Sequence, residues 1–106
     1  MSDEVIRGSG NVFADLGLPD ADGEMLKVDL AIAIKRAIQE RGLTQVQAAA
    51  VMGESQPNVS MIVGGKLSAF STERLMRLLA ALGKNLTITV SDAPTGQTRG
   101  QMRVSA

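Results

Sequence analysis

The chain has 106 residues, of which 44% are hydrophobic and only 2% aromatic, and its 11 basic side chains balance its 11 acidic ones. This length suffices for one domain with tails, and the composition predicts an aliphatic core of packed helices. The lack of tryptophan and tyrosine argues against stacking of single-stranded bases, and the lack of cysteine and histidine excludes zinc fingers, thiol chemistry and imidazole catalysis.

The charges are unevenly distributed along the chain. Residues 1–34 carry seven acidic and two basic side chains, a balance of −5. Residues 35–77 carry six basic and three acidic side chains, a balance of +3. Because nucleic-acid affinity depends on local contacts with phosphate, this weakly basic middle segment permits DNA binding without requiring it.

The chain is predicted to begin with an N-terminal arm, residues 1–22. Residues 1–9 are polar and are expected to be mobile. Phe13 lies in a short apolar cluster between Asn11 and Leu18. Docking of this cluster on its own domain is favoured, and a contribution to a partner surface is the alternative.

A first helix is predicted from about residue 23 to residue 41, ended by Gly42, with acidic side chains near its start where the helix dipole favours them. A second apolar stripe, formed by Met25, Val28 and Ile32, lies nearly opposite its core face. The helix is therefore expected to lie between two bodies, the second being either the N-terminal arm, which is favoured, or another chain. The core face repeats at helical spacing and comprises Leu26, Leu30, Ala33, Ile34, Ala37 and Ile38.

Residues 43–62 are predicted to form two short helices joined by a tight turn. Thr44 and Ser55 are suited to cap the two helices, and Gly53 is suited to end the first one in the left-handed conformation. Pro57 falls in the first turn of the second helix, where no N–H is needed. The small residues from Ala48 to Ala50 allow close crossing of the helices, which are expected to be locked together by Val51, Val59 and Ile62.

The outward face of the second helix favours DNA binding over an ordinary pair of helices in a core. It carries no charge, whereas a solvated helix face would normally carry lysine and glutamate. Amide, hydroxyl and apolar groups are those that contact base edges in the major groove. Pro57, Ser60 and Met61 are predicted to point outward, with Gln56 and Asn58 on the flanks.

A loop and a further helix are predicted next. The glycines of residues 64–70 suit close approach to phosphate, with Lys66 as a cation, although a flexible connector would also need them. Ser71 is suited to cap the next helix, and Gly83 is suited to end it. Its predicted core face is Leu75, Leu78, Leu79 and Leu82.

Residues 85–91 alternate strictly between polar and apolar side chains, which predicts a half-buried β-strand. A single strand needs a pairing partner, and pairing with the same strand of a second copy through Leu86, Ile88 and Val90 is favoured over pairing within the chain. Residues 92–106 are expected to form a disordered tail. The predicted organisation is thus the N-terminal arm, a DNA-binding domain with its dimerisation strand over residues 23–91, and this tail.

Particular residues carry a resemblance to a known family. Leu43-Thr44-Gln45, Ala49, Gly53, Ser55-Gln56-Pro57, Val59-Ser60 and Gly65-Lys66 resemble the Xre-type (Cro/repressor-like) helix-turn-helix proteins. Residues 10–17 and the terminal strand resemble the HigA-like antitoxins. The resemblance implies an all-α, lambda-repressor-like bundle that represses transcription from double-stranded DNA as a homodimer on a palindromic operator.

The resemblance also implies roles for individual residues. Gln45 would brace the recognition helix and touch phosphate, Gln56 would read a base, and Lys66 would contact backbone phosphate. Met61 departs from the polar residue often found at its position in the family. The candidate DNA-binding set is Gln45, Ser55, Gln56, Pro57, Asn58, Ser60, Met61 and Lys66.

An antitoxin would also bind a toxin, for which the acidic first third of the chain is suited. A ribonuclease toxin must be basic to bind RNA, so acidic groups would complement it. The candidate partner-binding residues are Phe13, Met25, Val28 and Ile32. The alternatives are a free-standing phage-type or metabolic regulator, and a protein-binding adaptor without DNA contact.

An enzyme is not expected, because the chain lacks the usual catalytic side chains and a glycine-rich phosphate loop. The acidic residues before the first helix are explained by the helix dipole, so neither a metal nor another cofactor is expected. No segment has the roughly 20 apolar residues of a membrane span, and no signal peptide is recognisable. We therefore expect a cytoplasmic protein that makes no membrane contact.

Overall fold

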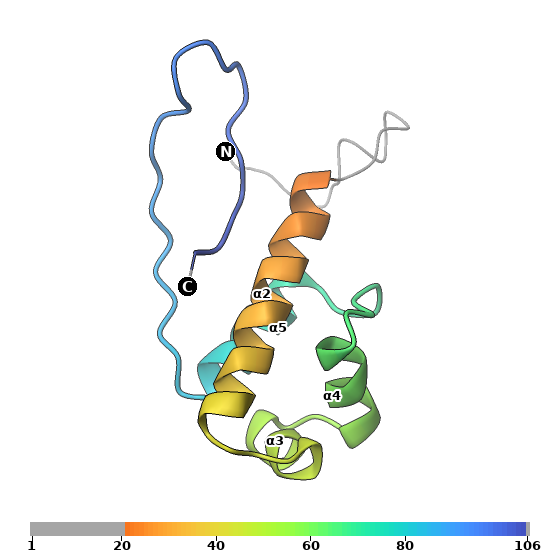
Figure 1. The fold of residues 1–106 in the computed structure, drawn as a ribbon. Helices are drawn as coiled ribbons and strands as arrows, with labels where there is room; N and C mark the ends of the chain where they lie inside the picture. The colour runs from red at the N-terminus through yellow and green to blue at the C-terminus, as the bar shows by residue number, and fades with distance from the viewer. Residues whose placement is uncertain (1–20, 106) are drawn as a thin grey trace.

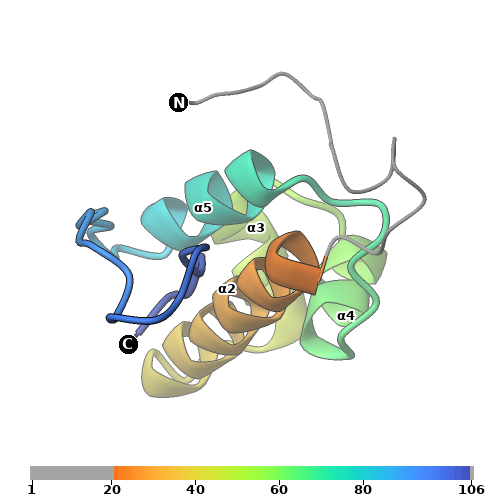
Figure 2. The same ribbon diagram turned by 90° about the horizontal axis from the view of Figure 1, so that it is seen from above.

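The computed structural model describes residues 21–105. The predictions for residues 1–20 of the N-terminal arm, including Phe13, lie outside this range, and residues 21–22, predicted as part of the arm, form the start of the first helix. The helices are α2 (Ala21–Glu40), α3 (Gln45–Met52), α4 (Gln56–Val63) and α5 (Thr72–Ala81). The long helix α2 packs against α4 and α5, and α3 packs against α4 and α5 (Figure 1). Seen from above, α5 lies on one side of α2 and α4 lies on the other side (Figure 2). The predicted all-α bundle is confirmed for the described residues.

The core is aliphatic, as the composition predicts, with one aromatic side chain at its centre. Phe70 is 1% exposed and has the largest side chain among the fully buried residues. The predicted core faces are confirmed, except that Leu26 on α2 is only half-buried. The fully buried side chains around Phe70 include Leu30 and Ile34 of α2, Val59 and Ile62 of α4, and Leu75 of α5.

The helix ends are those that local chemistry predicts. Ser71 accepts a hydrogen bond from the Arg74 N–H and caps α5. Gly42 and Gly83, with φ of 63° and 90°, adopt the left-handed conformation just beyond α2 and α5. Within residues 21–105, no helix is both long enough and apolar enough to cross a bilayer.

The expectation of a β-strand over residues 85–91 is not confirmed. Residues 84–93, called here the C-terminal arm, form no strand within the described chain, although they run extended away from the helices (Figure 1). Leu86 is half-buried on the core, whereas Ile88 and Val90 are 77% and 91% exposed. The physical reason is that a strand is defined by its ladder, and within residues 21–105 this segment forms no hydrogen-bonded ladder.

The expected disordered tail instead contacts α2. A turn closed by the Gln97 N–H and the Pro94 carbonyl reverses the chain, with Gly96 at φ 94°. Residues 98–105, called here the return segment, then lead back to the helices. Arg103 donates two hydrogen bonds of 2.7 and 2.9 Å to the Asp29 carboxylate, which also accepts the Val104 N–H at 3.0 Å. These bonds hold the pKa of the nearly buried Asp29 below its ordinary value, Arg103 contributing most.

Candidate nucleic-acid interface

Helices α3 and α4 are set by three local features that the sequence predicts. Thr44 forms a capping box, because its hydroxyl accepts the Gln47 N–H while the Gln47 side chain accepts the Thr44 N–H. Gly53 ends α3 at φ 69°, in the left-handed conformation. Ser55 caps α4 by accepting the Asn58 N–H, and a proline occupies the first turn. These predictions are confirmed.

The two helices are held together through small side chains on α3 and branched ones on α4. Ala48 is 0% and Ala49 6% exposed, which allows the close crossing expected from the alanine run. Val59 and Ile62 are buried as predicted. The prediction for Val51 is wrong, since it is 38% exposed, and the neighbouring Met52 is buried in its place. The inward-facing side of α3 passes through position 52 and not through position 51, and the long, flexible methionine side chain fills the core there.

The exposed side of α4 brings together several of the candidate residues. Gln56, Pro57 and Ser60 are exposed, and Ser55 stands at the exposed helix start. The Gln56 Nε2 donates a 2.7 Å hydrogen bond to the Oε1 of Gln45 on α3. One Nε2 hydrogen and the Oε1 of Gln56 remain available, because a carboxamide carries two donors and an acceptor. Gln45 therefore orients the Gln56 amide without consuming its capacity to bind a base.

Two of the candidate residues on α4 instead turn toward the protein. Asn58 is half-buried and its Nδ2 donates a 2.9 Å hydrogen bond to Glu54 Oε1. Met61 is half-buried and packs against the core. The outward orientation predicted for Met61 is therefore only partly realised, and Asn58 braces the turn through its side chain.

The turn between α3 and α4 is tied to α5 by a salt bridge that sequence reasoning missed. Arg74 donates from Nε and Nη2 to the two carboxylate oxygens of Glu54, at 2.9 and 2.6 Å. Its guanidinium also lies 4.9 Å from the centre of the Phe70 ring. The Glu54 side chain is 9% exposed and that of Arg74 is 41% exposed, so the pair is shielded on the Glu54 side. This pair fixes the start of α4 relative to the core.

The Glu54 carboxylate should make the stability of the domain sensitive to acid. Its hydrogen bond from Arg74, followed by the one from Asn58, holds its pKa below the ordinary 4.5. A carboxyl group whose pKa is lower in the folded state contributes stability above its unfolded-state pKa and loses it as the pH falls through the folded-state pKa.

We therefore expect the free energy of unfolding to be nearly constant above about pH 5 and to decline below pH 4.5. The Glu54→Gln variant should be less stable at neutral pH and should decline less in acid, as measured by urea denaturation across pH. Glu73→Gln is the control, because Glu73 forms an exposed salt bridge with Arg77. Equal acid sensitivity of Glu54→Gln and the wild type would contradict this role. The pKa of Asp29 is also lowered, so the free energy of unfolding should keep a residual decline in acid in both Glu54→Gln and Glu73→Gln.

Lys66 follows the C-terminal end of α4 after two glycines, Gly64 and Gly65. Its N–H donates to the Met61 carbonyl at 2.8 Å, and Gly65 adopts φ 79° to allow this reversal. The Lys66 side chain is exposed, and no salt bridge involves it within residues 21–105. It is thus a free cation beside the uncharged helix, as a phosphate contact requires.

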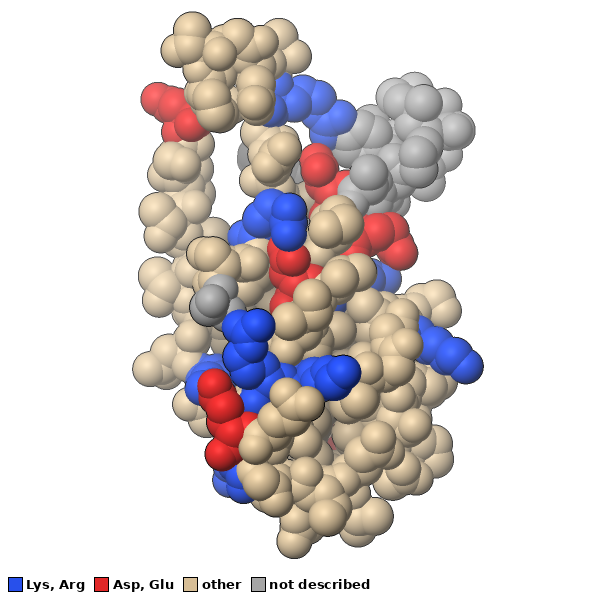
Figure 3. All heavy atoms as spheres, in the orientation of Figure 1, with Lys and Arg blue, Asp and Glu red and all other residues tan. Residues whose placement is uncertain are grey.

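The surface over α3 and α4 is largely uncharged in the view of Figure 3, where lysine and arginine gather mainly over α2 and the return segment. Five of the basic side chains in the described residues form ion pairs with acids, namely Arg74, Arg77, Lys84, Arg99 and Arg103. The interface therefore offers hydrogen-bonding groups at its centre and few free cations at its edge.

Two short helices joined by a glycine turn, with the second helix exposing amide and hydroxyl groups, define a helix-turn-helix DNA-binding domain. Residues 12–91 match the family described as helix-turn-helix domain. A solved structure of a protein described as a putative XRE family transcriptional regulator is 39% identical, with a TM-score of 0.77 over 83% of this chain and 99% of that one. No curated protein matches this chain.

The chain belongs to the helix-turn-helix domain family, as a DNA-binding transcriptional regulator of the XRE type. Neither match names a toxin or an antitoxin.

Proposed function

We propose that the protein is a sequence-specific repressor that binds a palindromic operator as a homodimer, with α4 in the major groove. The observation that carries this proposal is the uncharged, exposed side of α4, on which Gln45 holds the Gln56 amide ready for a base. A glutamine side chain can form two hydrogen bonds with adenine, and the free Gln56 donor and acceptor meet that need. Ser60 and Pro57 lie beside it for further groove contacts.

Base reading by Gln56 and phosphate contact by Lys66 predict different defects. Gln56→Ala should cost about 1–3 kcal/mol on the preferred operator and relax specificity at one base pair. Lys66→Ala should weaken binding to all sequences alike and reduce the salt slope by about one unit. Fluorescence anisotropy with a set of single-substitution operators, repeated at several salt concentrations, measures both effects.

Two substitutions on the body serve as matched controls for these variants. Gln39→Ala removes an exposed glutamine at the end of α2, and Lys84→Ala removes a lysine already paired with Glu40. Both should leave specificity unchanged. If Gln56→Ala discriminated among operators as sharply as the wild type, base reading would lie with other residues.

The homodimer would be formed by the C-terminal arm, whose strand would exist only between two copies. The arm exposes Ile88 and Val90 and has the alternation of a strand. Pairing of two arms about a two-fold axis would also supply the symmetry that a palindromic operator requires.

An antitoxin role is supported by the apolar stripe on α2. Met25, Val28 and Ile32 are 41%, 40% and 50% exposed. A hollow of about 150 Å³ lies next to them, between α2 and the end of α4, with Val28 and Ile32 on its α2 side and Val63 on its α4 side. Exposed apolar side chains beside a hollow suit an anchor residue of a protein partner. We propose a basic ribonuclease toxin as that partner, on account of the acidic first third of the chain.

The Val28→Ser/Ile32→Ser variant should lose toxin neutralisation by at least about tenfold, because central apolar contacts carry most of the affinity of an interface. Its stability should change little, since both side chains are half in solvent. Val46→Ser is the matched control, because Val46 on α3 is apolar and 68% exposed but lies off the stripe. The measurement is inhibition of the ribonuclease encoded by the adjacent gene.

The alternatives make opposite predictions in the same assays. A free-standing regulator would bind the operator but have no toxin encoded beside it, and the stripe would then cover the chain's own N-terminal arm. In that case removal of residues 1–20 would destabilise the wild type. It would destabilise the Val28→Ser/Ile32→Ser variant no further than that, because this variant has already lost its contacts with the arm. An adaptor would bind a partner without salt-dependent affinity for duplex DNA.

A further inference from the structure

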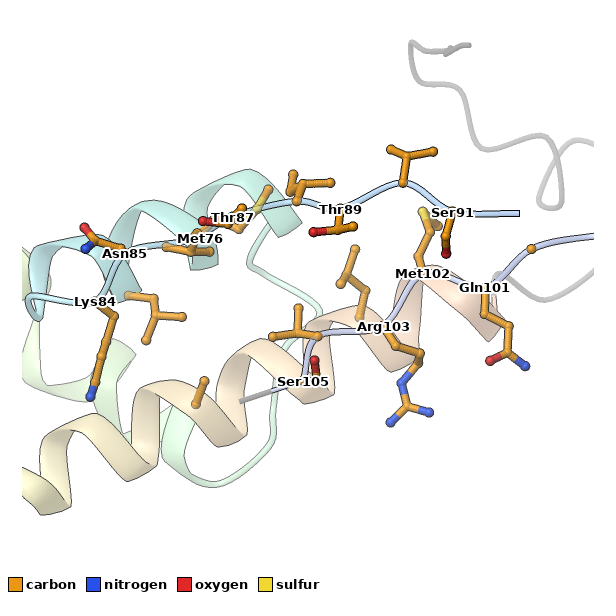
Figure 4. A pocket seen from close by; sticks show the side chains of 18 of the residues that line it. Met76, Lys84, Asn85, Thr87, Thr89, Ser91, Gln101, Met102, Arg103 and Ser105 are labelled. Atoms are coloured by element: carbon orange, nitrogen blue, oxygen red, sulfur yellow. The ribbon is translucent and has the colours of Figure 1, made fainter. Parts of the chain in front are cut away.

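A cavity of about 980 Å³ lies between the C-terminal arm and the return segment. Figure 4 shows the arm, with Thr87, Thr89 and Ser91, on one side of this space and the return segment, with Gln101 and Arg103, on the other. The two segments run in opposite directions and are joined by the turn at residues 94–97 (Figure 1). The cavity is thus a slot with an extended chain along each side.

Both sides of the slot have unsatisfied backbone groups. Within residues 21–105, no backbone amide or carbonyl of residues 85–93 forms a hydrogen bond. On the other side, the amides of residues 100–103 form none either, and Val104 uses its N–H on Asp29. An extended chain placed in the slot could form a ladder with each side.

The return segment is held in place to form such a ladder. The bidentate Arg103–Asp29 pair and the Val104 N–H fix it on α2, with the Asp29 side chain only 7% exposed. The helices supply an apolar floor to the slot through Leu26, Met76 and Leu79. A strand in this slot would therefore have hydrogen-bond partners on both edges and an apolar surface beneath it.

We propose that the slot receives residues 85–91 of a second copy, so that two protein chains form one interleaved four-stranded sheet. Its strand order would be the return segment, the arm of the partner, the arm, and the return segment of the partner. The two arms at the centre would be antiparallel, and each return segment would be parallel to the arm beside it. This proposal rests on the homodimer of the proposed function and adds its architecture.

The exposure of the arm favours a second copy over any other occupant. Leu86, Ile88 and Val90 share one face of the extended chain, but only Leu86, near the base of the arm, is covered by the helices. Antiparallel pairing about a two-fold axis would lay the exposed end of each arm over the base and helices of the other copy. The same operation fills both slots at once, which closes the assembly at two copies.

The experiment is residue-resolved amide hydrogen exchange on the full chain, with the oligomeric state at the same concentration measured by sedimentation equilibrium. In the interleaved sheet the arm is a central strand, so consecutive amides from residue 86 to residue 90 should exchange at least about tenfold more slowly than in an unstructured peptide. If the two arms paired alone, each would be an edge strand and only alternate amides would be protected. That result would overturn the interleaving and leave the proposed homodimer intact.

The Arg103→Gln variant tests the contribution of the return segment. It should release the segment from Asp29, remove protection from every second amide of the arm and weaken the dimer. Arg77→Gln is the control, because it breaks an exposed pair on α5 outside the slot. Unchanged protection in Arg103→Gln would overturn the proposal. A monomer with an unprotected arm would overturn both the interleaving and the homodimer, and a monomer with a protected arm would show that the slot closes within one chain.

Discussion

Replacing Phe70 with alanine is expected to destabilise the domain by about 3–5 kcal/mol, the usual cost of removing a large buried aromatic side chain. A domain of this size has a total stability of about 5–15 kcal/mol, so a large part of it would be lost. Phe70 is 1% exposed at the centre of the core, and Arg74 lies over its ring. The loss would therefore include the support that Arg74 gives to Glu54 and the turn before α4.

The measurement for Phe70→Ala is urea denaturation followed by circular dichroism, since the chain has no tryptophan or tyrosine to report by fluorescence. Phe70→Leu is the control, because it removes the ring but keeps much of the volume and should cost clearly less. A loss below about 1 kcal/mol for Phe70→Ala would show that the core closes around the vacated space.

Replacing Ile88 with proline is expected to abolish the proposed homodimer and to lower operator affinity by about 10²–10⁴-fold, which is the advantage gained by linking two half-site contacts. Proline removes a ladder N–H and restricts the residue before it. Within the described chain, Ile88 is 77% exposed and its N–H forms no hydrogen bond, so the isolated domain should keep its helices. Sedimentation, circular dichroism and anisotropy with a palindromic operator test the three statements.

Ile88→Thr is the matched control for this substitution. Threonine keeps the backbone N–H and the branched shape that strands favour, so the variant should remain dimeric, with at most a modest loss of affinity. Full operator affinity in a monomeric Ile88→Pro protein would show that one recognition helix suffices, and the two-fold arrangement would then be wrong.

The parts of the fold that depend on neighbouring residues could be predicted from the sequence. The caps at Thr44, Ser55 and Ser71 and the left-handed Gly53 act within three or four residues of themselves, so their effect is visible in a short window. The apolar spacing likewise located the core faces of α2 and α5.

The interactions between distant residues could not be predicted in the same way. Glu54 and Arg74 are 20 positions apart, and Asp29 and Arg103 are 74 apart, so no spacing rule connects either pair. The orientation of Asn58 follows from the first pair, because its amide joins the Glu54 carboxylate instead of facing outward. A lone acid in an otherwise uncharged turn was the one available signal for Glu54.

The C-terminal arm shows a different limit of sequence reasoning. Its alternation predicts a strand, and the segment is extended, but hydrogen bonding to a neighbouring chain segment decides whether a strand exists. Reading one copy of the sequence does not reveal that pairing partner, because in the proposed homodimer the partner is the same segment of a second copy. The dimer and the candidate DNA-binding residues stay predictions.

The scarcity of free cations around α4 bears on how the regulator is distributed in a cell. Non-specific affinity for DNA comes almost entirely from phosphate contacts, and the genome offers about 10⁶–10⁹ competing sites. A regulator with few free cations beside its uncharged recognition helix, Lys66 among them, would lose few molecules to those sites. A small number of copies would then keep the operator occupied. In the proposed homodimer each bound unit would need two chains, so occupancy would fall steeply as the copies are diluted or degraded.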